Sequence, residues 1–89
     1  MKIWKYQIGT KIVTDNTVQV DMPKGAEIIC VQAQREIPCV WALVDPEAQL
    51  ETRYFYIAAT GDDVPGGGRY VGTVFQHDGA YVWHIFEVW

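Results

Sequence analysis

The stretch YVGTVFQHDGAYVWHIFEVW, residues 70–89, decides the fold of this chain, because it reads as one β-hairpin. Two runs rich in β-branched and aromatic residues, 70–77 and 80–89, flank the dipeptide Asp78-Gly79. Asp-Gly between such runs favours a type I′ turn, whose two central residues both have positive φ. The turn fixes the register of the strands, and therefore which side chains share a face. The sequence predicts a compact β domain with aromatic residues on both faces of this hairpin.

The register of this hairpin separates a more buried face from a partly polar one. A loop made of Asp78-Gly79 sets the following pairs: Thr73 with His84, Phe75 with Val82, and Val71 with Phe86. Three large apolar residues share the opposite face, which we expect to be the more buried one: Val74, Trp83 and Ile85. Gly72 lies on that face too. Because it has no side chain, it leaves a gap that another group can approach closely.

Length and composition favour one small domain with more aromatic side chains than its core requires. Eighty-nine residues are enough for a single domain, predicted to span 1–89, and 49% of them are hydrophobic. The four Trp, five Tyr and three Phe residues are available for the core, for a stacking platform or for a subunit interface. Since small domains often gain stability by association, we expect a homo-oligomer.

A second hairpin is predicted in the middle of the chain, where two apolar runs, 27–34 and 38–44, flank Arg35-Glu36. With a two-residue turn the expected pairs are Gln34 with Ile37, Gln32 with Cys39, and Cys30 with Trp41. Both faces of this hairpin are apolar, so we expect both to be covered. A barrel, a sandwich, or a sheet covered by a second subunit meets that requirement.

Further strands are expected on both sides of this hairpin, at 2–8 and 51–60 among others. No run of ten or more residues has the helical period. We count about seven short antiparallel strands in all. The sequence therefore predicts a single all-β domain, either a small barrel or a sandwich.

The charge balance and the apolar pattern exclude several classes of partner. Eleven acidic and seven basic residues give a net charge of −4, whereas general nucleic-acid binding requires a basic face. No apolar run approaches the roughly 20 residues of a membrane span. The first residues lack the apolar region of a signal peptide, so a cytoplasmic location is expected. Cys30 and Cys39 are then free thiols, although a different loop length would place them opposite each other.

No constellation of residues predicts an enzyme, a metal site or a cofactor. His77 lies at a turn and His84 lies in mid-strand, about three pairs away, with no Cys or carboxylate at ligand spacing. Acid–base catalysis by paired carboxylates needs an apolar cleft, whereas these carboxylates lie in turns: Asp45, Glu47, Asp62, Asp63 and Asp78. We therefore predict a binding protein without catalytic residues.

A glycine-rich loop is the strongest candidate for a ligand site. The run DDVPGGG, residues 62–68, is followed by Arg69 and Tyr70. It is either a flexible connection or a site where glycine amides and an arginine contact an anion. The predicted ligand-binding residues are Arg69 for phosphate, Tyr70 for stacking on a base, Gly67, Gly68, and His84 as a hydrogen-bond donor.

Three runs of the chain resemble small uncharacterised proteins encoded by phages and by prophages. They are MPKGAEIICVQ (22–32), PCVWALVDPE (38–47), and the ending with YVGTV (70–74) and HIFE (84–87). The resemblance covers most of the chain, and its motifs are structural ones, without catalytic residues. It implies a phage origin.

That origin implies a role against host defence inside the host cell. We expect the domain to sequester a small anionic nucleotide that serves as an immune signal, without altering it. The alternatives are an inhibitor that binds a host defence protein, and a structural or accessory phage protein. Exposed arginine and tyrosine serve either kind of partner, so composition does not separate a nucleotide from a protein.

Overall fold

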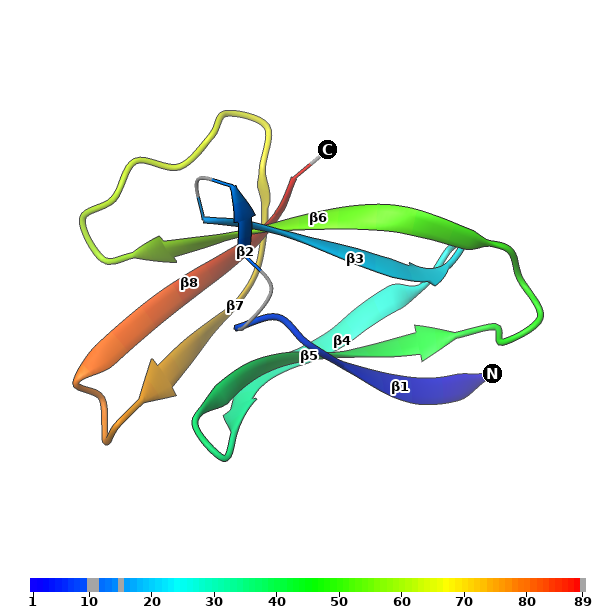
Figure 1. The fold of residues 1–89 in the computed structure, drawn as a ribbon, viewed down its shortest axis with the longest axis horizontal. Helices are drawn as coiled ribbons and strands as arrows, with labels where there is room; N and C mark the ends of the chain where they lie inside the picture. The colour runs from blue at the N-terminus through cyan, green and yellow to red at the C-terminus, as the bar shows by residue number, and fades with distance from the viewer. Residues whose placement is uncertain (10–11, 15, 89) are drawn as a thin grey trace.

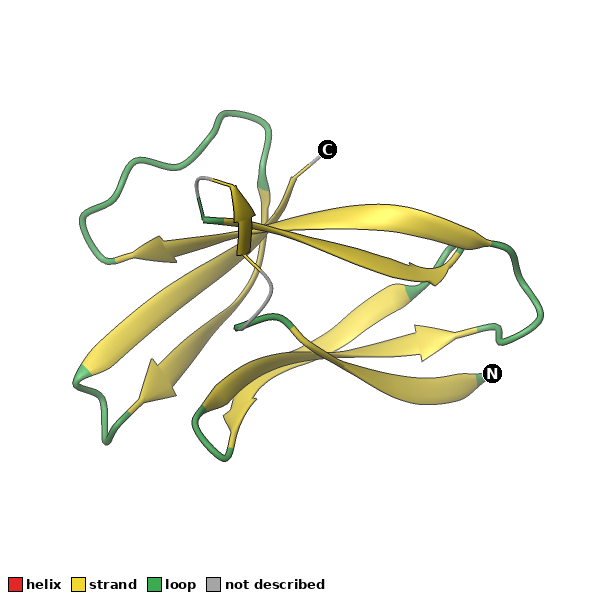
Figure 2. Cartoon of the chain, in the orientation of Figure 1, coloured by secondary structure: helices red, strands yellow, loops and turns green. Residues whose placement is uncertain are grey.

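The computed structural model describes residues 1–9, 12–14 and 16–88, and within them the chain consists of strands and loops (Figures 1 and 2). The strands are β1 (Lys2–Gln7), β2 (Ile12–Thr14), β3 (Thr17–Pro23), β4 (Glu27–Gln34), β5 (Ile37–Val44), β6 (Leu50–Ala59), β7 (Arg69–Gln76) and β8 (Tyr81–Val88). The all-β prediction is confirmed. The seven longer strands match the expected number, and β2 adds a strand of three residues.

The strands form two antiparallel sheets in the described part of the chain. The smaller sheet has the order β1-β5-β4, and the larger has the order β2-β3-β6-β8-β7. The edge strands β4 and β7 lie next to each other, but no ladder joins them, so the sheets do not close into a barrel. Of the two predicted architectures, the sandwich is supported and the barrel is wrong.

The central hairpin has the predicted register over most of its length. Gln34 pairs with Ile37, and both turn residues, Arg35 and Glu36, have positive φ (51° and 68°). A bulge between Ile28 and Cys30 breaks the alternation, which leaves Ile29 47% exposed. Within the described part of one chain, only one of the two apolar faces of this hairpin is covered, and the expectation that both are covered stays a prediction that depends on a second subunit. One face packs on the larger sheet, while the other carries side chains that stay half-exposed: Cys30, Trp41 and Leu43.

The core lies between the two sheets. Each sheet contributes one set of buried residues: Val31, Val40, Ala42 and Val44 from the smaller, and Val18, Phe55, Ile57, Val74 and Ile85 from the larger. The gap predicted at Gly72 is filled by Val31 of the smaller sheet. A Cβ atom on Gly72 would lie only 2.8 Å from the Val31 Cβ.

The terminal hairpin turns at Asp78-Gly79 as predicted, with φ of 55° and 87° at these residues. Thr73 pairs with His84, and the expected inward face is confirmed: Val74 and Ile85 are buried, and Trp83 packs against the core. The prediction fails toward the start of β7. A bulge between Tyr70 and Gly72 places Tyr70, and not Val71, opposite Phe86.

Hydrogen bonds join the turns of the two hairpins. Gln76 Nε2 donates to the carbonyl oxygen of Glu36, and the His77 backbone N–H donates to Glu36 Oε2, both at 2.5 Å. These contacts connect residues about forty positions apart in the sequence. They fix the smaller sheet against the larger one at this end of the sandwich.

Candidate functional site

Charged side chains from β6, β7 and β8 form a cluster on the inner face of the larger sheet. Arg53 of β6 donates hydrogen bonds to Glu87 of β8, from Nε to Oε2 and from Nη2 to Oε1, the second 3.1 Å long. Arg69 adds one bond of 3.2 Å, from its Nη2 to Oε1. The Arg53 side chain is 14% exposed and that of Arg69 is 71% exposed. Arg53 therefore holds Glu87 in place, while the Arg69 guanidinium faces solvent.

The environment of this cluster keeps Glu87 ionised. Burial on its own would raise the pKa of Glu87, but hydrogen bonds and positive charge from Arg53, aided by Arg69, outweigh it and lower that pKa. The same hydrogen bond raises the pKa of Arg53. Because Arg53 already gives Glu87 two hydrogen bonds, Arg69 can turn toward another anion without leaving the carboxylate unpaired.

A groove of about 540 Å³ lies beside Arg69, between the beginnings of the edge strands β4 and β7. One wall comes from the turn before β4 and the start of β4, with Ala26, Glu27 and Ile28, and the other comes from β7, with Arg69, Tyr70 and Val71. The Val71 bulge interrupts the regular pleat in one wall, and the Ile29 bulge follows directly after the other. The strands meet again further along, where Val31 packs on Gly72.

A chain of hydrogen-bonded side chains begins at Tyr70 on the outer face of the larger sheet. The Tyr70 hydroxyl lies 2.6 Å from Thr73 Oγ1, which lies 3.1 Å from His84 Nδ1. On the other side of the ring, Thr60 Oγ1 lies 2.8 Å from His84 Nε2. The Tyr70 ring also packs edge-on against Phe86, with ring centroids 5.6 Å apart. The polar chain is thus set into an aromatic surface.

Two hydroxyl groups hold His84 in this chain, one at each ring nitrogen. A neutral imidazole has one donor and one acceptor nitrogen, so one threonine accepts a hydrogen bond from His84 and the other donates to it. Nucleophilic catalysis needs a base that a third group orients, commonly a carboxylate. Here both ring nitrogens of His84 face hydroxyl groups instead.

The structure divides the predicted ligand residues between two places. Arg69 lies with Glu87 on the inward side, whereas Tyr70 and His84 meet through Thr73 on the outer face. Arg69 pairs with Glu87, and His84 lies three residues before Glu87 in β8. Because side chains alternate along a strand, His84 points to the opposite face of the sheet from Arg69. Of the two glycines, Gly67 is exposed with φ of 85°, and Gly68 lies close to Phe86 and Val88. Arg69 and Tyr70 still share the groove, because both line it.

Two members of the polar chain, Thr73 and Thr60, are not among the ligand residues predicted from the sequence. Thr73 was placed correctly opposite His84, but its hydroxyl was not recognised as the link to Tyr70. Thr60 follows β6, and it reaches His84 only because β6 pairs with β8, a pairing that no turn motif signals.

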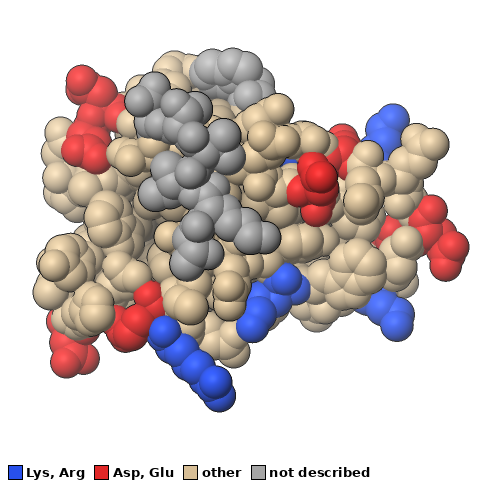
Figure 3. All heavy atoms as spheres, in the orientation of Figure 1, with Lys and Arg blue, Asp and Glu red and all other residues tan. Residues whose placement is uncertain are grey.

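Charge on the visible surface is mixed. In the view of Figure 3, Lys and Arg side chains and Asp and Glu side chains are spread over the surface, and neither kind gathers into one large patch. Within the part of the chain that the structure describes, no three His, Cys, Asp or Glu side chains come together in a way that could hold a metal ion. Both cysteines are free thiols, with Cys39 buried and Cys30 half-buried. The described residues contain no helix with the length and apolar character to cross a membrane.

Comparison with known proteins places the chain in a family. No curated protein and no solved structure matches it. A family model does match, and it covers residues 1–89. The chain that carries the groove beside Arg69 and the hydrogen bonds at His84 therefore belongs to the family described as a domain of unknown function, DUF7352.

Proposed function

We propose that this domain is a non-catalytic binding protein that captures a small anionic nucleotide in the groove beside Arg69. The observation that carries the proposal is the exposed Arg69 guanidinium at a groove of about 540 Å³. This volume lies within the range of about 300–1,000 Å³ that small-molecule sites occupy. A guanidinium forms paired hydrogen bonds with phosphate oxygens, and only one bond, to Glu87, holds Arg69 among the described residues.

Neighbouring groups complement the other parts of a nucleotide. Tyr70 also lines the groove, and its ring, 57% exposed on the outer face beside it, is the group we propose for stacking on a base. Glu27 lines the opposite wall of the groove, and its carboxylate would accept hydrogen bonds from ribose hydroxyl or base amino groups. A carboxylate here disfavours a ligand with many phosphates. We therefore propose a ligand with few charges, such as a cyclic nucleotide.

The resemblance to phage proteins suggests the setting of this activity. A protein that holds a nucleotide immune signal lowers its free concentration by binding alone, provided that the protein is abundant and the complex is tight. In this proposal the domain acts in the cytoplasm of the host cell and releases the nucleotide chemically intact.

A protein partner is the second candidate, and it is favoured by exposed aromatic side chains on the outer face of β7. Tyr70 is 57% exposed and Phe75 63% exposed, and both point away from the core. Exposed aromatic residues of this kind are enriched where proteins meet. The partner could be a host protein or a second copy of this chain, in line with the expected homo-oligomer.

Calorimetry against a panel of cyclic dinucleotides and cyclic ADP-ribose isomers tests the first proposal. We expect saturable binding by the wild-type protein, and binding at least tenfold weaker for Arg69→Ala. Arg35→Ala is the matched control, because it removes the same charge from an exposed turn outside the groove. Mass spectrometry of the ligand after denaturation should show it unaltered.

The results have distinct consequences. Equal binding by Arg69→Ala and wild type would exclude the groove as the site, and no binding by any panel member would favour a protein partner. Recovery of a cleaved ligand would overturn the non-catalytic part of the proposal.

A further inference from the structure

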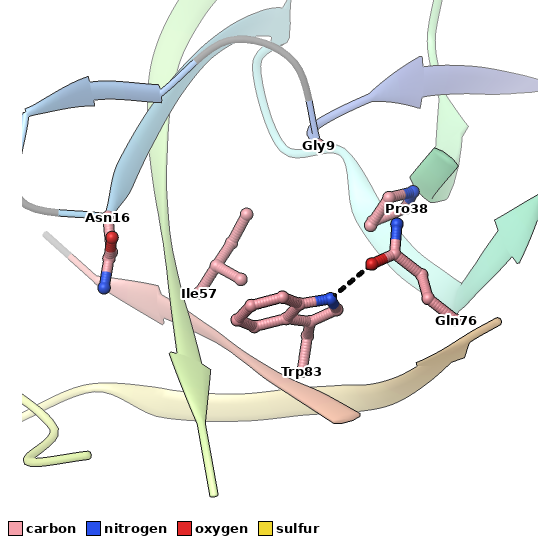
Figure 4. A pocket seen from close by; sticks show the side chains of 6 residues that line it. All are labelled: Gly9, Asn16, Pro38, Ile57, Gln76 and Trp83. Atoms are coloured by element: carbon pink, nitrogen blue, oxygen red, sulfur yellow. Dashed lines mark hydrogen bonds between the residues drawn. The ribbon is translucent and has the colours of Figure 1, made fainter. Parts of the chain in front are cut away.

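A second, smaller pocket lies between the sheets at the other end of β7. Its volume is about 150 Å³, and its lining comes from both sheets: Gly9, Asn16, Pro38, Ile57, Gln76 and Trp83 (Figure 4). Gln76 ends β7 and Arg69 begins it, so about 23 Å of strand separates this pocket from the groove. One mononucleotide does not span that distance, which makes the two sites independent.

The walls of this pocket are fixed by backbone contacts. The amide groups of Ile8 and Gly9 both donate to the Pro38 carbonyl oxygen, at 2.9 and 3.3 Å. A Cβ on Gly9 would lie 2.5 Å from the Pro38 Cδ, so the Gly9 backbone rests directly against the proline ring. On another side, the Ile57 amide donates to the Asn16 carbonyl oxygen at 2.9 Å.

The side-chain amide and the indole N–H in the pocket are already paired with each other. Trp83 Nε1 donates to Gln76 Oε1 at 2.6 Å, as the dashed line in Figure 4 marks, and Gln76 Nε2 donates to the Glu36 carbonyl oxygen. The indole ring lies between Ile57 and Gln76 in the same view. What remains for a ligand is the surface of the indole ring, the buried Ile57 side chain, the Pro38 ring and, at the edge of the pocket, the exposed side chain of Asn16.

We infer that this pocket binds a small uncharged aromatic molecule of one or two rings. A mainly apolar pocket of about 150 Å³ is large enough to take up benzene. Aromatic rings pack favourably edge-on or offset against an indole. A charged ligand would have to give up hydration without a partner of opposite charge, because none of the described lining residues is charged.

Titration of the labelled protein, followed by NMR, tests this inference with defined probes: benzene, indole, cyclohexane and benzoate. We expect saturable shifts of the Ile57 methyl signals and of the Trp83 Nε1–H signal with benzene and indole. Benzoate should bind at least tenfold more weakly than benzene, because of its charge. Tighter binding of cyclohexane than of benzene would overturn the aromatic preference.

Two variants separate this pocket from other apolar surfaces. Ile57→Phe fills the space with a ring of the protein, so it should bind benzene at least tenfold more weakly. Phe75→Ala removes an exposed ring from the outer face of the same hairpin, so it should bind benzene as the wild type does. Shifts confined to Tyr70 and Phe75, or no saturable shift at all, would refute the inference. If Ile57→Phe does not fold, the wild-type titration still tests the inference: benzene should shift the Ile57 and Trp83 signals, and benzoate should bind at least tenfold more weakly.

Discussion

Replacing Gly72 by alanine is the most direct test of how the two sheets meet. The new Cβ would lie 2.8 Å from the Val31 Cβ and 3.3 Å from its Cγ2. Both Cβ atoms are attached to strand backbone, so neither can rotate away, and the strands have to separate. Overpacking of this kind costs about 1–3 kcal/mol. Alanine in a strand recovers about 0.5–1 kcal/mol relative to glycine, which leaves a net loss of about 1 kcal/mol at the middle of the two ranges.

Urea unfolding, followed by tryptophan fluorescence, measures this loss as a change in the free energy of unfolding. Gly66→Ala is the control, because nothing lies within 4 Å of a Cβ at that exposed position. The double variant Val31→Gly/Gly72→Ala should be more stable than the sum of the single changes predicts, by at least about 0.5 kcal/mol. If Gly72→Ala is as stable as wild type, or if the two changes are additive, the close approach of β4 and β7 is wrong.

Further outcomes follow from the charged cluster and from the exposed aromatic face. Glu87→Gln should lower the free energy of unfolding at pH 7 by about 1.5–3 kcal/mol, since the only carboxylate left to Arg53 among the described residues is that of Glu51, at 3.4 Å. Because the folded-state pKa of Glu87 is lowered, its contribution is complete above the unfolded value of about 4.3 and is lost as pH falls through the folded value. Urea curves at pH 7 and pH 3 should show the gap between wild type and variant narrowing; a constant gap would contradict this sign. Arg69→Ala should change stability by no more than about 1 kcal/mol in calorimetry, because the side chain is 71% exposed, and a larger loss would assign Arg69 a structural role. Light scattering should give the mass of two chains, and a monomer mass that does not change with concentration would disprove the predicted homo-oligomer.

The parts of this fold that could be predicted depend on contacts close in sequence. The Asp78-Gly79 turn and the alternation around it fix the pairing of Thr73 with His84, because each pair follows from the one before. The same reasoning holds at the Arg35-Glu36 turn, even though neither residue is glycine. Turn chemistry and period therefore carry most of the hairpin register.

The bulges were not predictable in the same way. A bulge adds one residue to a strand without changing its composition, so nothing in the sequence marks Ile29 or Val71 as the extra residue. The Val71 bulge moves Tyr70 opposite Phe86, which changes the surroundings of a predicted ligand residue. The contact between His84 and Thr60 is missed for a related reason, since it joins residues 24 positions apart through the pairing of β6 with β8.

The four open edges of the two sheets restrict how copies of this chain can associate. β4 and β7 carry bulges and lie against each other, and β2 is only three residues long. β1 is regular, but it carries Lys2 and Lys5, whose charges would be brought together by a second copy of the same strand. Each edge is thus protected against strand addition, by irregularity, by shortness or by charge. Strand addition at these edges is therefore disfavoured, which favours a dimer formed by side chains over a fibril that grows by adding strands.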